Sequence, residues 1–144
     1  MRFLNDSDYA VQLRDEIALI IDPTTERSKL IRAEDMAIAQ IKNFLGGKYD
    51  VAKIFAPVVS GADDTRDAYI VMITIDLALY HLWSKEGGNN IPKTRELRYS
   101  DALEWLKAVQ YDHSANLPLI TNASGETASD IRLWSRRTLS DNQY

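Results

Sequence analysis

Length, composition and charge exclude several classes of protein. The chain has 144 residues, the size of one domain, of which 45% are hydrophobic and 26% are charged. This balance excludes a disordered or collagen-like chain. The absence of cysteine excludes a disulfide scaffold, a zinc–thiolate site and a cysteine nucleophile. The formal net charge of −4 disfavours a nucleic-acid binder, which needs a basic face to neutralise phosphates.

The first predicted helix covers residues 7–21. Asn5, Asp6 and Ser7 are residue types that cap helix N-termini. The helix is expected to end at Asp22, because a residue that precedes proline avoids the helical region. One apolar stripe is expected to be buried, formed by Ala10, Leu13, Ile17, Ile20 and Ile21.

The second predicted helix covers residues 26–45, with Thr24 or Thr25 as its N-cap. Gly46 and Gly47 follow it and predict a left-handed C-terminal stop. Residues 48–57 are expected to form a connector and residues 60–62 a turn. The expected apolar face consists of Leu30, Ala33, Ala37, Ile38, Ile41, Phe44 and Leu45, and the connector offers Tyr49, Val51, Ile54 and Phe55 to the core.

The third predicted helix, residues 64–86, is apolar on nearly every side between residues 68 and 83, which is typical of a central helix. Its first turn is expected to hold Asp63, Asp64 and Asp67, whose negative charge suits the positive N-terminal end of a helix. Its apolar stretch is too short to span a bilayer, and no signal peptide precedes the helices, so we expect an intracellular, soluble protein.

The fourth predicted helix covers residues 93–111 and begins just after Pro92. Tyr99 and Trp105 are expected to flank its buried stripe. That stripe is predicted to consist of Leu97, Ala102, Leu103, Leu106 and Val109.

After residue 113 the helical periodicity stops, and the remaining residues are polar apart from two apolar clusters. We therefore predict an all-α fold: a four-helix antiparallel bundle over residues 1–113 with a central apolar helix, and an extended C-terminal arm over residues 114–144. Tryptophan and arginine are common anchors at protein interfaces, so a partner-binding arm is favoured over nucleic-acid binding or a tail with incidental arginines. The candidate partner-binding residues are Leu119, Ile120, Ile131, Arg132, Leu133, Trp134, Arg136 and Arg137.

Two polar side chains, Asp76 and His81, interrupt the apolar helix. A carboxylate in such a helix must be paired, hydrogen-bonded or solvent-facing, and a lone imidazole there is more often structural than catalytic. His113 is expected to lie at the end of the last helix, where positive charge suits the helix dipole. The sequence has no phosphate-loop, dinucleotide-binding or nucleophile-elbow motif. We therefore assign no catalytic, cofactor-binding or metal-binding residue.

Two alternatives stay open at this point. A small helical enzyme would use Asp76 and His81 as its reactive groups. A regulatory or DNA-binding module would use the basic residues of the fourth helix, although acidic residues balance them.

Three segments carry a family resemblance: residues 37–49 (AIAQIKNFLGGKY), 76–82 (DLALYHL) and 98–106 (RYSDALEWL). Their order and spacing resemble the small helical head–tail connector proteins of tailed bacteriophages and prophages. The resemblance covers roughly residues 3–120, so the role of the later residues rests on their composition alone.

The resemblance implies a virion structural protein rather than an enzyme, with no cofactor. Such proteins are made in the host cytoplasm and form a homo-oligomeric adaptor ring in the virion neck, beneath the portal. The ring would hold about twelve copies, following closed cyclic symmetry. Its partners would be the portal protein, neighbouring adaptor subunits, and tail or stopper proteins. Genomic DNA would pass through the ring without sequence-specific binding, and no membrane would be involved.

Overall fold

The computed structural model of the chain describes residues 2–12, 27–59, 61–85, 91–111, 115–121 and 127. Across these residues the fold is all-α, as predicted, and isolated bridges are its only β-structure. No helix in the described ranges has the length and apolar character needed to cross a membrane. The helices are α1 (Asp6–Gln12), α3 (Ser28–Leu45), α4 (Val51–Ile54), α5 (Ala68–Lys85) and α6 (Lys93–Tyr111).

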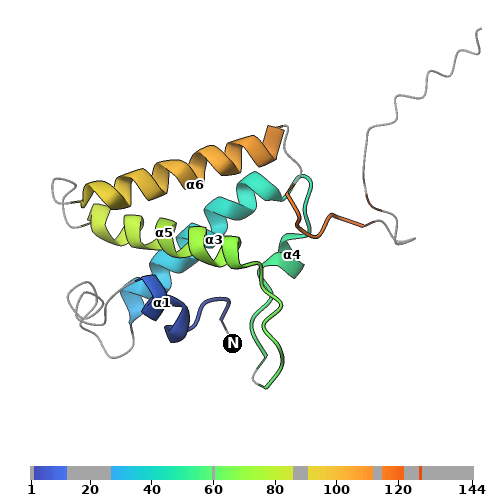
Figure 1. Cartoon of the computed structure of the whole chain (residues 1–144), viewed down its shortest axis with the longest axis horizontal. Helices are drawn as coiled ribbons and strands as arrows, with labels where there is room; N and C mark the ends of the chain where they lie inside the picture. Colours follow the sequence, from blue (N-terminus) through green and yellow to red (C-terminus); the bar gives the residue numbers. More distant parts are fainter. Residues whose placement is uncertain are drawn as a thin grey trace, which may run out of the picture.

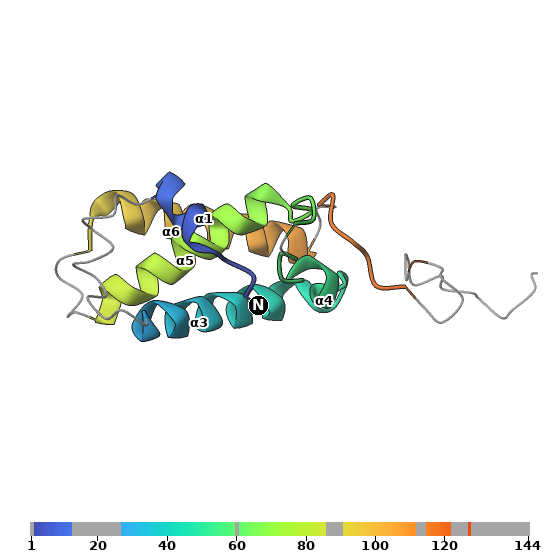
Figure 2. The same ribbon diagram turned by 90° about the horizontal axis from the view of Figure 1, so that it is seen from below.

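Helix α5 packs against α3, α6 and α1 (Figure 1). It runs antiparallel to both α3 and α6 (Figures 1 and 2), and α3 and α6 also contact each other. Contact on several sides explains why the α5 sequence has no polar stripe. Its buried apolar side chains are Ile70, Ile73, Ile75, Leu77, Ala78, Leu79 and Leu82.

Helix α1 begins with a reciprocal cap. The Asn5 side-chain oxygen accepts from the Asp8 N–H at 3.0 Å, and the Asp8 carboxylate accepts from the Asn5 N–H at 2.8 Å. The predicted stripe is wrong at its first position: Ala10 is exposed, and Tyr9 is buried in its place. Tyr9 faces the core because its hydroxyl reaches Glu34 on α3. The other stripe positions lie outside the described residues.

Helix α3 begins at Ser28 rather than residue 26, and the two candidate threonine caps lie outside the described residues. All seven predicted apolar positions pack into or against the core. The predicted left-handed stop is wrong, because Gly46 has right-handed values of φ −64° and ψ −14°. The Gly46 N–H continues the helical ladder to the Lys42 carbonyl, and the Tyr49 N–H then bonds to the Leu45 carbonyl. These bonds satisfy the carbonyls of Lys42 and Leu45 without a left-handed residue.

The connector contains one helical turn, α4, which was not predicted. Asp50 caps it by accepting from the Lys53 N–H at 3.2 Å. Tyr49, Ile54 and Phe55 are buried and Val51 packs against the core, so the prediction that these side chains fill the core is confirmed.

Helix α5 begins at Ala68, four residues later than predicted, because Asp67 is its N-cap. The Asp67 carboxylate accepts from the N–H groups of Tyr69 and Ile70, both at 2.9 Å. Asp63 and Asp64 lie before the helix, and Asp64 binds Arg66 instead, so the predicted place of both in the first turn is wrong. Gly61 has a φ of +82°, which fits the predicted turn at this point of the chain.

Helix α6 has the predicted bounds, and the Pro92 carbonyl accepts its first N–H bonds. Ala102, Leu106 and Val109 are buried as predicted. Leu97 is 52% exposed, so its place in the buried stripe was predicted wrongly. It lies five residues before Ala102, which turns it about 140° away from the face that meets α5.

Candidate partner-binding site

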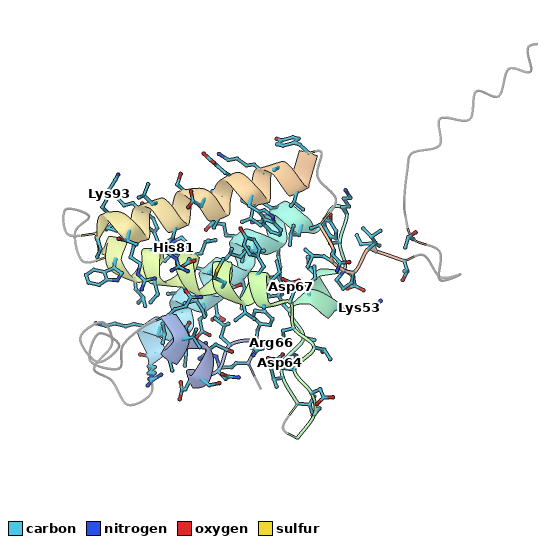
Figure 3. The ribbon with its side chains drawn as sticks, in the orientation of Figure 1. Lys53, Asp64, Arg66, Asp67, His81 and Lys93 are labelled. Atoms are coloured by element: carbon cyan, nitrogen blue, oxygen red, sulfur yellow. The ribbon has the colours of Figure 1, made fainter. Side chains whose placement is uncertain are left out.

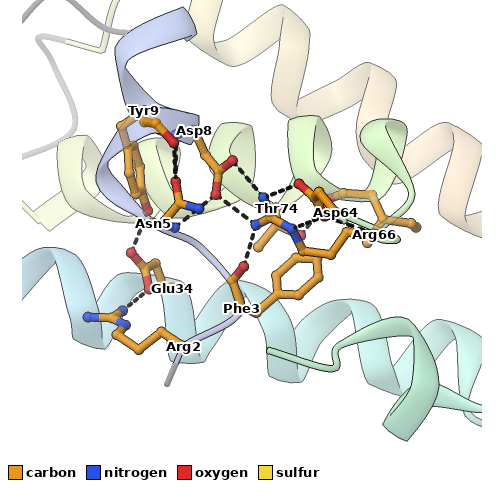
Figure 4. Close-up of polar contacts among 11 residues, drawn as sticks. Arg2, Phe3, Asn5, Asp8, Tyr9, Glu34, Asp64, Arg66 and Thr74 are labelled. Atoms are coloured by element: carbon orange, nitrogen blue, oxygen red, sulfur yellow. Dashed lines mark hydrogen bonds and ion pairs between the residues drawn. The ribbon is translucent and has the colours of Figure 1, made fainter. Parts of the chain in front are cut away.

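Arg66 joins the N-terminal segment to the start of α5 (Figure 4). Its guanidinium donates to both carboxylate oxygens of Asp8, at 2.7 and 2.9 Å, and to both carboxylate oxygens of Asp64, at 2.9 and 2.7 Å. It also donates to the Phe3 carbonyl, and its side chain is only 6% exposed. Its hydrogen bonds lower the pKa of Asp64 to about 2, and the two carboxylates raise the pKa of Arg66. The cluster therefore fixes residues 3–8 against the helical core.

Glu34 is a buried acidic residue on α3 that the sequence did not predict. Its carboxylate accepts from the Tyr9 hydroxyl at 2.8 Å and pairs with Arg2 (Figure 4). Burial raises the pKa of Tyr9, so this hydroxyl stays protonated and donates. The only signal in the sequence is an acidic residue beside the apolar stripe of α3, and that pattern is too common to single it out.

Asp76, on α5, is 3% exposed, and its carboxylate faces α6. Its Oδ1 is 2.8 Å from Arg98 Nε and 3.5 Å from Arg95 Nη1. Both arginines also donate to Gln12 at the end of α1, Arg95 at 3.2 Å and Arg98 at 3.4 Å. Burial raises the pKa of Asp76, although the two arginines oppose that shift. Of the three alternatives for this carboxylate, the structure shows pairing, and the cluster joins three helices.

Toward the C-terminal end of α5, His81, Gln40 and Tyr99 form a contact of uncharged side chains, which we call the uncharged junction. The Nε2 of His81 lies 2.9 Å from Gln40 Oε1 and donates to it, because an amide oxygen can only accept. The Gln40 amide nitrogen in turn donates to the Tyr99 hydroxyl at 3.3 Å. Tyr99 stacks on Tyr80 with ring centroids 3.8 Å apart. Burial lowers the pKa of His81, which favours the neutral ring.

These contacts bring the three sequence segments of the resemblance together. Gln40 comes from the first segment, Asp76 and His81 from the second, and Arg98 and Tyr99 from the third. Segments that are far apart in the chain therefore meet across α3, α5 and α6.

The contacts of Asp76 and His81 show whether these two polar residues of α5 lie together, as a reactive pair would. Asp76 binds arginines and His81 binds Gln40, and no hydrogen bond joins the two within the described part of the chain. Figure 3 shows His81 far along α5 from Asp64 and Arg66. No group of three His, Cys, Asp or Glu side chains among the described residues could hold a metal ion. His113 lies outside the described residues.

Residues 115–121, the beginning of the predicted arm, run beside residues 48–50. Leu119 forms an antiparallel bridge with Tyr49, and both Leu119 and Ile120 are half-buried. The body therefore holds the root of the arm through its backbone. Three hydrogen bonds secure the pairing: Asp50 N–H to the Pro118 carbonyl at 2.8 Å, Ile120 N–H to the Lys48 carbonyl at 3.2 Å, and Ala115 N–H to the Tyr49 hydroxyl at 2.8 Å.

The other predicted partner-binding residues lie outside the described residues. These residues are Ile131, Arg132, Leu133, Trp134, Arg136 and Arg137.

The proposed division into a body of residues 1–113 and an arm of residues 114–144 stays a prediction.

A groove opens beside the arm root. It has a volume of about 370 Å³, and Tyr69 and Trp105 form its aromatic wall, with ring centroids 4.8 Å apart. Ala115 and Leu117 form the wall on the side of the arm. Helices α5 and α6 thus combine with the arm root into an open, mainly apolar surface that sequence reasoning did not identify.

No protein-family model matches the chain, and neither a curated protein nor a solved structure matches it.

Proposed function

We propose that this chain is a head–tail connector subunit of a tailed bacteriophage or prophage. Residues 1–113 would form a four-helix antiparallel bundle as the ring body, and residues 114–144 an arm that binds partners. About twelve copies would form the ring beneath the portal, in the virion neck. The portal protein, neighbouring subunits, and tail or stopper proteins would be the partners, and DNA would pass through the ring unbound. In this proposal the protein is not an enzyme and needs no cofactor.

The observation that carries the proposal is the arm root. Backbone hydrogen bonds hold residues 118 and 120 on residues 48–50, so the next residues start from a fixed point on the body. An adaptor needs such a fixed exit, because a segment that orders on binding loses less entropy when one end is already held. Leu119 and Ile120, both candidate partner-binding residues, belong to this root.

The helical body supports the same proposal. A ring subunit that transmits force between a capsid and a tail needs helices that do not slide. Side chains of α1, α5 and α6 meet at Asp76, and side chains of α3, α5 and α6 meet around His81. The segments that carry the family resemblance supply most of these contacts, so they hold the helices of the body together.

The alternative, a small helical enzyme or regulatory module, has less support. An enzyme would need reactive groups with free capacity near a cavity. Asp76 already binds two arginines, and the ring nitrogen Nε2 of His81 already binds Gln40.

Deletion of the gene tests the proposed function. Electron microscopy of lysates without the protein should show filled or empty heads separated from tails, and full-length protein supplied in trans should restore joined particles. A chain that ends after Thr121 keeps the arm root, so it should keep its helical circular dichroism and fail to restore joining. Normally joined virions in the absence of the protein would refute the connector role.

A further inference from the structure

The groove beside the arm root combines aromatic walls with an acidic rim. Tyr69 is 39% exposed although its ring packs edge-on against Trp105. Asp67 lines the same groove and is exposed. Asp101 lies one helical turn before Trp105 and is exposed, and its charge adds to burial in raising the pKa of Tyr69. The groove therefore presents apolar rings between carboxylates and suits a cationic, aromatic segment.

The chain carries a segment of this chemistry. Residues 131–137 read IRLWSRR, with three arginines and no acidic residue. In an extended segment, side chains alternate between two sides. Arg132, Trp134 and Arg136 would then share one side, with an arginine about 7 Å from the tryptophan in each direction. This spacing complements the aromatic pair of the groove and its two carboxylates.

The direction of the arm root indicates which copy supplies the segment. Residues 115–117 line the groove, and the chain then runs away from α5 and α6 through residue 121 in both views (Figures 1 and 2). The described residues of the arm root thus lead away from their own groove, and this direction favours a neighbouring copy as the source of the bound segment. A contact between an arm and a groove joins two different surfaces, and repeated contacts of this kind form a ring when the rotation from one copy to the next closes.

We propose that residues 131–137 of one copy bind the groove of the next copy. Trp134 would lie on Tyr69 and Trp105, and Arg132 and Arg136 would lie beside Asp67 and Asp101. This inference rests on the proposed connector function and deepens it, since it names the surface through which neighbouring subunits join.

Disulfide trapping tests the contact directly, because the natural chain has no cysteine. Two full-length variants, Asn116→Cys and Ser135→Cys, are mixed and oxidised. Asn116 lines the groove and is exposed, so the mixture should yield a disulfide-linked dimer of the two variants. The matched control replaces N116C by Met36→Cys, which is exposed on α3, and should yield no mixed dimer with S135C above background.

The chain that carries both N116C and S135C separates the two possible directions of binding. Binding between copies should give a ladder of disulfide-linked oligomers. A monomer with an internal disulfide, and no mixed dimer, would show that the arm binds its own groove and would overturn the proposal. Absence of both products would also overturn it.

Self-association measured by sedimentation gives a second readout. Loss of an aromatic anchor typically costs 2 kcal/mol or more, so Trp134→Ala should weaken association roughly 30-fold. Asp101→Lys should also weaken it, and a second change, Arg136→Asp, should restore part of the loss. Asp101 is exposed, and circular dichroism checks that each variant is folded. Unchanged association in W134A and D101K would refute the contact.

These results are independent of the test of the proposed function. If deletion separates heads from tails but no mixed disulfide forms, only the contact between arm and groove fails. If the mixed disulfide forms but deletion leaves virions intact, the contact stands and the connector role fails.

Discussion

Two clusters of arginine and aspartate hold α5, and they differ in how much water reaches the carboxylate. Asp64 is about half exposed, whereas the Asp76 side chain is 3% exposed. Both carboxylates contact a guanidinium within 3 Å. Yet the pKa of Asp64 falls to about 2 and the pKa of Asp76 rises.

The difference shows that burial can outweigh pairing. A guanidinium stabilises a neighbouring carboxylate in both clusters, but Asp76 loses its hydration and Asp64 keeps much of it. We therefore expect that Asp76 serves more to hold the helices in one arrangement than to add net stability. The following predictions test this comparison.

Removal of the buried carboxylate should have the largest effect. Asp76→Ala leaves Arg98 and Arg95 beside the core without their counter-ion, so the free energy of unfolding should fall by about 3 kcal/mol. Urea denaturation measures the change. The matched variant, Asp64→Ala, should lose less than about 1 kcal/mol because its carboxylate is half exposed. Equal losses in the two variants would show that burial does not separate the clusters.

Loss of the shared cation in the other cluster should have the next largest effect. Arg66→Met keeps an apolar stem over Phe3 but removes the bonds to Asp8 and Asp64, and should cost about 2 kcal/mol. Thermal unfolding followed by circular dichroism measures it. Arg27→Met is the control, because Arg27 pairs with the well-exposed Asp6 and its loss should cost about 0.5 kcal/mol or less. A loss in R66M no larger than in R27M would contradict the anchoring role.

Acid should act on the two carboxylates with opposite sign. The folded-state pKa of Asp64, about 2, lies below the ordinary value of 3.8, so its stabilisation is present above pH 3.8 and is lost as the pH falls toward 2. The pKa of Asp76 lies above 3.8, so the folded chain binds this proton first. Protonation of Asp76 therefore raises the free energy of unfolding as the pH falls through its raised pKa.

Two asparagine variants separate these contributions. Asp64→Asn should flatten the loss of stability between about pH 4 and 2, and Asp76→Asn should make the acid loss steeper. The measurement is a series of urea titrations at stepped pH. Slopes that change in the same direction in the two variants would refute the opposite pKa shifts.

The uncharged junction should give the smallest effect. The pKa of His81 lies below its ordinary 6.5, so its neutral ring stabilises the fold above pH 6.5, and this contribution is lost as the pH falls through the folded-state pKa. His81→Gln, which can still donate to Gln40, should reduce the loss of stability between about pH 7 and 5. Titrations in urea measure it, and an unchanged loss would argue against burial of a neutral ring.

Local patterns predicted much of the helical structure. Helix α6 has its predicted bounds because Pro92 and the following periodicity are signals within one segment. The apolar face of α3 is confirmed at every predicted position for the same reason. Leu97 fails because its hydrophobicity says nothing of the direction in which α5 lies. Asp64 fails because an acidic residue before a helix has the same pattern whether it caps the helix or binds Arg66.

The candidate site depended on contacts that no local pattern contains. The sequence by itself determined that Asp76 had to be paired, hydrogen-bonded or solvent-facing, because a buried carboxylate without a partner is too costly. Only the tertiary structure decided that the partners are Arg95 and Arg98, and only it placed Leu117 beside Tyr69 to line a groove. Periodicity and capping act within a few residues of each other, whereas these contacts depend on how α5, α6 and the arm root are arranged in space.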